Sequence, residues 1–283
     1  MKLPFILAKR FVAGETFDEA VPKITELNSK NIPITLDLLG ENVKDRVTAD
    51  KTVATYIELL EAIKEAKLDS TISIKLTMIG LDIDYEYCQN NLYRLLEVAK
   101  KNDQFVRIDM EGSDYTQVTI DVFTEAFKLY GKHVGIVIQA YLHRTKDDIS
   151  MLANIGADVR LCKGAYKESK DIALQDMDDI REAYKEYAKV LIEKTKMPRM
   201  ATHDEILVDW LMKYANQENI EISRFEFQML YGLRQDTMEE LTSKGYNTRI
   251  YVPFGTMWFP YFKRRLMERK ENIWFIFSTM FKK

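Results

Sequence analysis

The order of apolar and polar residues divides the chain into short strand-like runs and longer helix-like segments. Apolar, β-branched runs recur throughout, and each is followed by a longer charged segment whose apolar residues have helical spacing. This alternation is the main structural signal in the sequence. The predicted strands are Ile34–Leu38, Ile72–Leu76, Phe105–Asp109, Val134–Gln139, Asp158–Leu161, Arg199–Thr202, Phe225–Met229 and Thr248–Val252.

The segments between these runs are predicted to be amphipathic helices. In Ala49–Ala66, for example, Val53, Tyr56, Leu60 and Ile63 fall on one stripe, with Asp50 and Lys64 suited to the two ends. A helix at Thr16–Asn28 precedes the first strand, and we expect it to plug the bottom of the fold. The remaining predicted helices are Tyr85–Lys100, Tyr115–Tyr130, a short Lys146–Asn154, Asp178–Lys194, Glu205–Ala215, Asp236–Thr242 and Met257–Lys270.

Strands that alternate with helices pair in parallel through right-handed crossovers, and eight such units close into a barrel. The sequence therefore predicts an α/β fold, a (β/α)8 TIM-type barrel with outer helices and extra N-terminal and C-terminal helices. No Pro/Gly-rich linker, repeat or low-complexity segment divides the chain. We expect residues 1–283 to form a single domain.

Composition excludes several classes of function. The formal net charge of −3 and pI near 5.8 give no field that would attract nucleic acid. The two cysteines, Cys88 and Cys162, lie far apart and lack the clustered partners of a metal site, so we expect neither a metal nor a disulfide. No apolar run is long enough to cross a bilayer, which favours a cytoplasmic protein. The aromatic tail Asn272–Phe281 is predicted to pack on the barrel rather than to lie on a membrane.

Active sites of such barrels form at the carboxyl ends of the strands, so the polar residues that follow the apolar runs are candidates. No GxGxxG follows any strand, and a dinucleotide-binding unit of the Rossmann type is not predicted. The strand-end candidates are Asp37, Glu41, Lys75, Asp109, Glu111, Gln139, Arg160, Lys163, Thr202, His203, Gln228 and Tyr251.

Lys75 has apolar neighbours on both sides, so its ammonium requires a counter-charge at the barrel mouth. It fits a Schiff-base nucleophile, a clamp for a substrate carboxylate, or a structural ion pair with Asp109 or Glu111. Arg160, Lys163 and Gly164 fit close approach of a phosphate or flavin, but ordinary ion pairs explain the two cations equally well.

Arg264 and Arg265 are adjacent on the last predicted helix and diverge by about 100° around its axis. Paired guanidinium groups suit a small carboxylate, but the spacing alone favours a solvated basic face that continues through Lys263. His203 fits either a ligand contact or a helix cap. Tyr166 and Tyr251 fit either the walls of a flat ligand site or the core and rim.

Eight ordered motifs together resemble the proline dehydrogenase family. They are ISIKLT, RIDMEG, VIQAY, VRLCKGAY, ATHDE, FEFQMLYG, RIYVPFG and YFKRRLME, and they extend over roughly Phe5 to Phe281. Agreement of eight segments in order is far more specific than any single motif. The resemblance is to monofunctional bacterial enzymes that oxidise L-proline with FAD.

The resemblance implies roles for residues at the barrel mouth. Lys75, Arg264 and Arg265 would hold the proline carboxylate, Leu230 would contact the ring, and Glu41 would close the site by pairing with Arg264. Asp109, Arg160, Tyr166 and Tyr251 would be catalytic, with Asp109 organising the arginine pair. The residues expected to bind FAD are Met110, Gln139, Arg160, Lys163, Gly164, Ala165, Thr202, His203, Gln228 and Glu268.

The implied reaction is hydride transfer from proline to flavin N5, which gives Δ1-pyrroline-5-carboxylate as the first step of proline catabolism to glutamate. A membrane quinone would take the electrons, which implies transient peripheral contact with the inner face of the cell membrane. Two alternatives stay open from the residues alone: a Schiff-base lyase or aldolase that uses Lys75 or Lys163, and a barrel that serves only as a binding scaffold.

Overall fold

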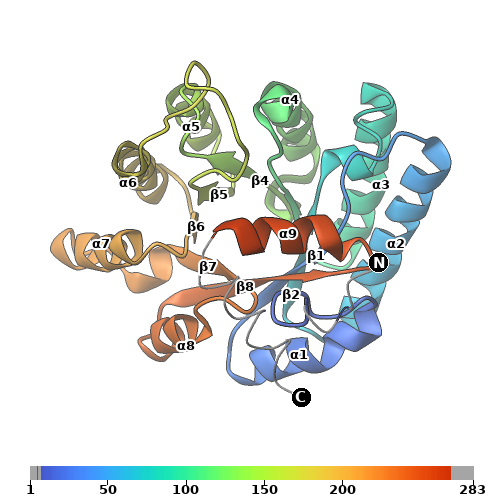
Figure 1. Ribbon diagram of the computed structural model, residues 1–283, viewed down its shortest axis with the longest axis horizontal. Helices are drawn as coiled ribbons and strands as arrows, with labels where there is room; N and C mark the ends of the chain where they lie inside the picture. The colour runs from blue at the N-terminus through green and yellow to red at the C-terminus, as the bar shows by residue number, and fades with distance from the viewer. Residues whose placement is uncertain (1–4, 6–7, 269–283) are drawn as a thin grey trace.

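Eight parallel strands close into a barrel, which confirms the predicted fold (Figure 1). The computed structural model describes residue 5 and residues 8–268, with side chains described through residue 265. Neighbours in the barrel follow chain order, and β1 pairs with both β2 and β8 to close it. The strands are β1 Ile34–Leu38, β2 Ser70–Ile74, β3 Val106–Ile108, β4 Val134–Gln139, β5 Val159–Cys162, β6 Arg199–Ala201, β7 Glu226–Leu230 and β8 Asn247–Phe254.

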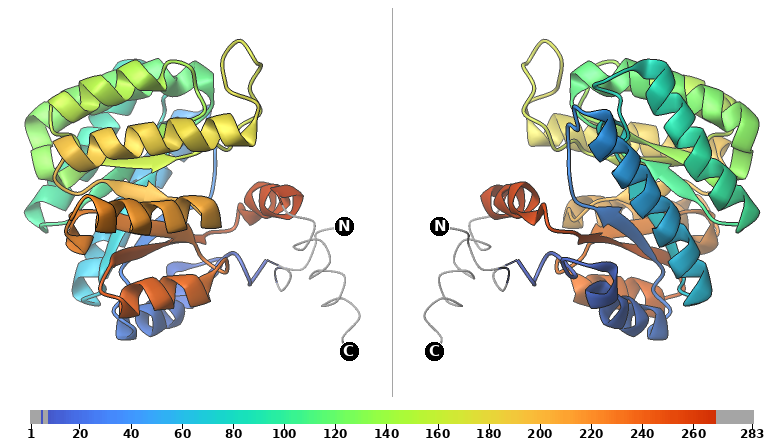
Figure 2. Two further views of the ribbon diagram at one scale, coloured as in Figure 1. Left: turned by 90° about the vertical axis from the view of Figure 1, so that its left-hand side faces the viewer. Right: turned by 90° about the vertical axis from the view of Figure 1, so that its right-hand side faces the viewer.

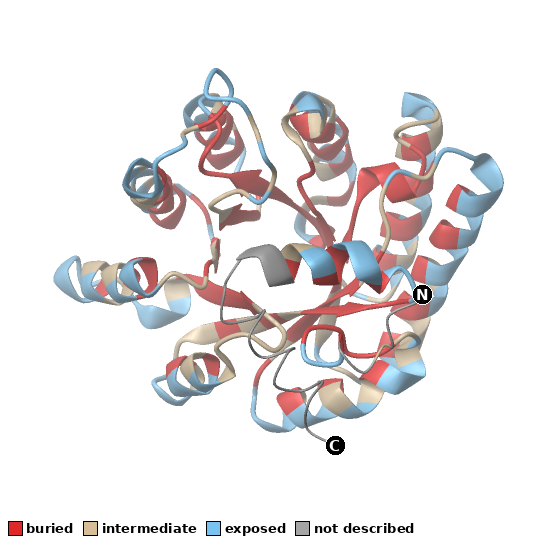
Figure 3. Ribbon diagram, viewed as in Figure 1, coloured by how far each residue is buried: buried red, intermediate tan, exposed pale blue. Residues whose placement is uncertain are grey.

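Alternation along each strand separates the core from the interior of the barrel. In β1, the aliphatic Ile34 and Leu36 belong to the main apolar core. Thr35 lies between them in sequence, and its Oγ1 meets Ser73 Oγ of β2 at 3.3 Å. Apolar side chains therefore pack beneath the helices, while the polar ones share the barrel interior. Figure 3 shows the same division, with buried strands inside and helices exposed on their outer faces.

The helices surround the barrel and begin at residues that cap them. Asp45 accepts a hydrogen bond from Thr48 N, so the second helix starts at Arg46, about a turn earlier than predicted. The prediction that Asp50 marks this end was wrong, because the local cap lies upstream. The helices are α1 Phe17–Ser29, α2 Arg46–Glu65, α3 Tyr85–Lys101, α4 Ser113–Tyr130, α5 Thr145–Asn154, α6 Met177–Lys194, α7 Glu205–Gln217, α8 Gln235–Ser243 and α9 Trp258–Glu268.

The two extra helices occupy different places. α1 lies at the outside of the barrel between α8 and α2, not under its bottom opening as predicted (Figure 1). Its buried residues Ile24 and Leu27 share the core of the outward-facing β1 residues, and Lys30 pairs with Glu239 of α8. Helix α9, which follows β8, instead crosses the end of the barrel where the strands terminate (Figures 1 and 2).

The barrel interior is charged rather than aliphatic. Arg107 of β3 donates to Asp158, whose carboxylate also accepts from Arg199 of β6 at 3.0 Å. Arg199 also forms an ion pair with Glu226 of β7 at 2.9 Å. Glu226 forms a second ion pair with Arg249 of β8 at 3.0 Å. Such barrels usually fill these layers with branched aliphatic side chains. The sequence analysis did not predict this network. Its signal is the alternation of charged and apolar residues within these strands.

Candidate active site

A cavity of about 760 Å³ opens at the carboxyl ends of the strands and is lined in part by Tyr261, Arg264 and Arg265 of α9. Its walls come from residues at the ends of all strands from β1 to β8 and from α9. This is where parallel barrels place their ligands, because the loops that follow the strands converge there. The volume lies within the ~300–1,000 Å³ range of small-molecule sites. Among the described residues, no helix is long and apolar enough to span a bilayer, and no group of His, Cys, Asp and Glu is arranged to hold a metal.

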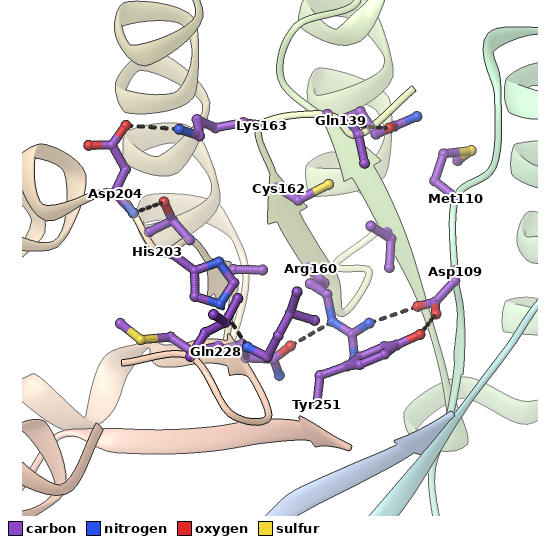
Figure 4. A pocket seen from close by; sticks show the side chains of 18 of the residues that line it. Asp109, Met110, Gln139, Arg160, Cys162, Lys163, His203, Asp204, Gln228 and Tyr251 are labelled. Atoms are coloured by element: carbon purple, nitrogen blue, oxygen red, sulfur yellow. Dashed lines mark hydrogen bonds and ion pairs between the residues drawn. The ribbon is translucent and has the colours of Figure 1, made fainter. Parts of the chain in front are cut away.

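Arg160 lines the cavity and is held by three hydrogen bonds, of which Figure 4 shows those to Asp109 and Gln228. Its Nη1 donates to Asp109 Oδ1 at 2.7 Å, its Nε to Gln228 Oε1 at 2.6 Å, and its Nη2 to Ser73 Oγ at 3.1 Å. The guanidinium carbon lies 5.3 Å from the centre of the Tyr251 ring, where the aromatic face attracts a cation. The orientation of this charge is thus fixed before any ligand binds.

Asp109 connects Arg160 to Tyr251. The Tyr251 hydroxyl donates to Asp109 Oδ2 at 2.7 Å, while Oδ1 accepts from Arg160. Burial raises the pKa of Asp109, and the nearby Arg160 and Lys75 oppose that shift. Burial also raises the pKa of Tyr251 well above its usual value, so the phenol stays protonated and remains a donor to Asp109. Asp109 therefore joins the guanidinium of Arg160 and the hydroxyl of Tyr251 in one buried network.

Lys75 pairs with Asp37 of the neighbouring strand β1, at 2.9 Å between Nζ and Oδ1. The ion pair considered in the sequence analysis was with Asp109 or Glu111, so the predicted partner of Lys75 was wrong. β2 ends at Ile74, one residue before Lys75, whose side chain is nevertheless only 8% exposed. Burial lowers the pKa of the Lys75 ammonium, but Asp37 and Asp109 raise it by more, so that its net pKa lies above the usual value. A lysine held in its charged form is a poor nucleophile and a good anion ligand.

Both arginines of α9 line the cavity, so the solvated basic face favoured by spacing alone is not what forms. Arg265 is 9% exposed, and Arg264 is half-buried, while their neighbour Lys263 is exposed. Arg264 Nη2 donates to Glu41 Oε1 at 2.5 Å, and its guanidinium carbon lies 6.0 Å from the centre of the Tyr166 ring. Glu41 thereby connects the β1–α2 loop to α9 across the rim of the cavity.

Lys163 and Gly164 follow β5 at another side of the cavity. Lys163 Nζ donates to Asp204 Oδ2 at 2.8 Å, and the same oxygen accepts from Arg181 Nε of α6 at 2.9 Å (Figure 4). Gly164 has a φ of 131°, and a Cβ there would lie 2.3 Å from the Tyr141 ring. Only glycine lets the backbone take this path along the cavity wall.

His203 does not cap α7, because the neighbouring Asp204 does so by accepting from Ile206 N at 3.2 Å. The Nε2 atom of His203 accepts from Leu230 N at 2.8 Å, which places the imidazole between the ends of β6 and β7. Gln139 bridges two other loops: its Nε2 donates to Glu111 O at 2.9 Å, and its Oε1 accepts from Ala165 N at 3.3 Å. Both side chains therefore connect loops around the mouth.

Most of the residues singled out in the sequence line this one cavity. Glu41 and Glu111 are not among the lining residues, but Glu41 lies at the rim and accepts a hydrogen bond from the lining residue Arg264. Glu268 ends α9, and its side chain lies outside the described part of the chain, as does the tail from residue 269. The residues that do line the cavity are Asp37, Lys75, Asp109, Met110, Gln139, Arg160, Lys163, Gly164, Ala165, Tyr166, Thr202, His203, Gln228, Leu230, Tyr251, Arg264 and Arg265.

Sequence reasoning missed several polar residues of the cavity. Asp204, Arg181 and Arg234 line it, and Arg234 donates to His203 O at 2.9 Å. Asp204 carried a usable signal, since an Asp before a helix-forming run predicts a cap. Arg181 and Arg234 carried none, because each lies on or beside a helix whose facing direction depends on how it packs.

Comparison with known proteins agrees with this arrangement. The family model described as proline dehydrogenase matches residues 20–276. The chain is 39% identical over 278 residues to proline dehydrogenase 2 of Bacillus subtilis strain 168, covering 98% of this chain and 91% of that protein. It is 34% identical over 280 residues to proline dehydrogenase of Deinococcus radiodurans, covering 98% of this chain and 90% of that protein.

A solved structure of proline utilization A from Bdellovibrio bacteriovorus has the same barrel. The superposition gives a TM-score of 0.87 at 27% sequence identity and covers 93% of this chain. This chain spans 33% of that longer protein. Since a family model matches nearly all of the barrel and relatives above 30% identity match along almost their whole length, the chain belongs to the proline dehydrogenase family.

Proposed function

We propose that this protein oxidises L-proline to Δ1-pyrroline-5-carboxylate with FAD as cofactor, as the first step of proline catabolism to glutamate. The observation that carries the proposal is the convergence of Lys75, Arg160, Arg264 and Arg265 on one cavity. We further propose that residues 1–283 form one barrel domain, and that a quinone receives the electrons. We propose that this quinone is held in the membrane. The enzyme would then be cytoplasmic and would make transient contact with the inner face of the cell membrane.

Three cations suit the carboxylate of proline. Lys75, Arg264 and Arg265 line the same cavity, from β2 and α9. Lys75 and Arg264 keep one carboxylate partner each, Asp37 and Glu41, and their other donors remain for a ligand. Guanidinium forks bind carboxylates with two parallel hydrogen bonds, which fixes the orientation of the substrate as well as its affinity. Leu230, Tyr166 and Tyr251 provide apolar surface for the ring.

The cavity also fits FAD. Cationic side chains Lys163, Arg181 and Arg234 line it together and suit a diphosphate, while Gly164 permits close approach of the backbone. We propose that the cofactor is held by Met110, Gln139, Arg160, Lys163, Gly164, Ala165, Thr202, His203 and Gln228, with Glu268 as a further candidate. FAD, when bound, supplies the acceptor for a hydride at flavin N5.

The protein residues position the reactants and set the local charge. Arg160 presents a fixed positive charge, because Asp109, Gln228 and Ser73 hold three of its nitrogens. Such a charge favours a more anionic form of a ring placed against it without reorganisation during the reaction. Tyr251 and Tyr166 line the cavity and exclude water from it. We propose that Asp109, Arg160, Tyr166 and Tyr251 form the catalytic set in this sense.

The Schiff-base alternative is disfavoured by the state of Lys75. A nucleophilic lysine must lose its proton, yet Asp37 and Asp109 hold the pKa of Lys75 above its usual value. The deciding experiment is the visible spectrum of the purified protein before and after anaerobic addition of L-proline. We expect a yellow protein whose absorption bleaches with L-proline and not with D-proline. A colourless protein that is trapped on Lys75 by borohydride and substrate would refute the proposal.

A further inference from the structure

Two loops reach Arg264 from different strands. The β1–α2 loop brings Glu41, whose Oε1 accepts from Arg264 Nη2 at 2.5 Å. The loop after β5 brings Tyr166, whose ring centre lies 6.0 Å from the Arg264 guanidinium carbon. The geometry of the proposed carboxylate site therefore depends on how far apart these two loops are held. Glu41 and Tyr166 are only partly buried, so their positions depend on the loops that carry them.

Both loops are tied to one residue, Glu111, which follows β3. Its side chain accepts from Thr77 N at 3.2 Å and from Thr77 Oγ1 at 2.7 Å. Thr77 in turn holds the Glu41 loop, because its Oγ1 accepts from Asn42 N at 3.1 Å and its carbonyl accepts from Val43 N at 3.1 Å. The chain of bonds thus runs from Glu111 to the residue directly after Glu41.

The main chain of Glu111 holds the second loop. Its carbonyl accepts from Gln139 Nε2 at 2.9 Å, and Gln139 Oε1 accepts from Ala165 N at 3.3 Å, directly before Tyr166. The same region is fixed again by Glu168, which accepts from Ser113 N and from Ser113 Oγ at 2.8 Å each. The segment after β3 is therefore the common support of the two loops.

The direction of these bonds follows from the chemistry of the groups. An ionised carboxylate only accepts, so the single hydroxyl hydrogen of Thr77 points to Glu111. Its lone pairs then face Asn42 N, which can only donate. Glu111 is 4% exposed and Thr77 is fully buried, so neither group can exchange its partner for water. The side chain at position 111 thereby orients the anchor of the Glu41 loop.

We propose that Glu111 is a positioning residue that, through Thr77 and Gln139, sets the spacing of the two loops at Arg264 and hence the fit of the substrate clamp. The inference rests on the proposed function for the identity of the substrate. Glu111 and Thr77 lie outside the cavity lining, so they act through Glu41 and Tyr166 rather than on the ligand.

The test is a set of substitutions at Thr77. Thr77→Val keeps the shape of the buried side chain and removes only the hydroxyl. We expect it to raise the KM for L-proline about tenfold, because the hydroxyl's two hydrogen bonds, to Glu111 and from Asn42 N, are lost, with kcat nearly unchanged. Thr77→Ser keeps the hydroxyl and should restore the KM to within about twofold. Glu111→Gln should raise the KM in the same direction. Flavin content and the visible spectrum should stay as in the unsubstituted enzyme.

A double-mutant cycle with Glu41→Ala separates positioning from general destabilisation. If Thr77 acts through the Glu41 loop, adding Thr77→Val to Glu41→Ala should raise the KM little further. Fully additive effects, or an unchanged KM in Thr77→Val, would overturn the proposal.

Hydrogen exchange of the protein without proline gives a readout that needs no turnover. Thr77→Val should speed exchange in residues 39–45 and leave helix α7 (Glu205–Gln217), which shares none of these bonds, as it was. Unchanged exchange in residues 39–45 would refute the proposal that Thr77 holds the Glu41 loop, even if proline oxidation is normal. Failure of the unsubstituted enzyme to oxidise proline would instead count against the proposed function. The exchange measurement would still show whether Thr77 holds the Glu41 loop.

Discussion

Arg160 on β5 and Asp109 after β3 form an ion pair of 2.7 Å across the interior of the barrel, although β4 lies between their strands. Their side chains are 7% and 11% exposed, so neither charge has water as a substitute partner. The pair therefore fixes the cation on the cavity floor, and it makes each member dependent on the other.

Replacing Asp109 by Ala should destabilise the protein strongly. The substitution leaves the buried Arg160 without its carboxylate, which we expect to lower the free energy of unfolding by about 3 kcal/mol. Urea unfolding measures this change. Glu240→Ala is the control, because Glu240 forms a pair with Lys244 in which both side chains are more than half exposed. Equal losses in the two variants would contradict a special role for the buried pair.

Arg264→Ala should weaken proline binding without removing the cofactor. Loss of a charge-assisted bidentate contact is worth about 1.5–3 kcal/mol, which corresponds to a ~10- to 100-fold rise in the KM for proline. Steady-state kinetics and the flavin-to-protein ratio measure the two effects. Lys263→Ala, on the exposed face of the same helix, should leave both unchanged. An Arg264→Ala enzyme with an unaltered KM would remove this residue from the clamp.

Acid should destabilise the barrel through Asp158. Burial acts to raise the pKa of this carboxyl, but Arg107 and Arg199 outweigh it and lower the pKa to about 2 from 3.8. Since the folded pKa is depressed, the stabilisation is complete above about pH 4 and is lost as the pH falls toward 2. It amounts to about 2 kcal/mol.

The Asp158→Asn variant tests this dependence. It should be less stable at pH 6, and its stability should fall less steeply than that of the unsubstituted protein between about pH 4 and pH 2. Urea unfolding at a series of pH values gives both quantities. If the free energy of unfolding fell equally steeply with pH in the two proteins, Asp158 would not be the source of the acid destabilisation.

Gly164→Ala should disturb the cavity wall. At a φ of 131°, a new Cβ would lie 2.3 Å from the Tyr141 ring, so the loop or the ring has to shift. We expect a loss of about 2 kcal/mol or more in unfolding free energy, together with weaker retention of the proposed FAD cofactor. Gly156→Ala is the control, since its φ is 70° and no atom lies within 4 Å of the added Cβ. It should cost only about 1 kcal/mol and leave the flavin in place.

Much of the architecture could be predicted from the sequence. The period of apolar residues indicated all eight strands, since strand and helix periods are local properties of the chain. Parallel closure then placed the strand ends at one mouth, which is why Lys75, Arg160 and His203 could be expected to meet. For Arg264 and Arg265, the helical spacing alone favoured a basic face exposed to solvent. Only the resemblance of their motif to the family indicated that they line the cavity.

The pairings inside the barrel depended on the tertiary structure. Which carboxylate meets Lys75, and which charges join Arg107, Asp158 and Arg199, depends on the register between neighbouring strands. The position of α1 beside α8 likewise follows from which outer surface the ring of helices leaves uncovered. The sequence by itself determined the order of elements and the residue types at the mouth, because both follow from local periodicity. Only the folded barrel decided their partners, because contacts between distant segments arise from closure and register rather than from neighbours along the chain.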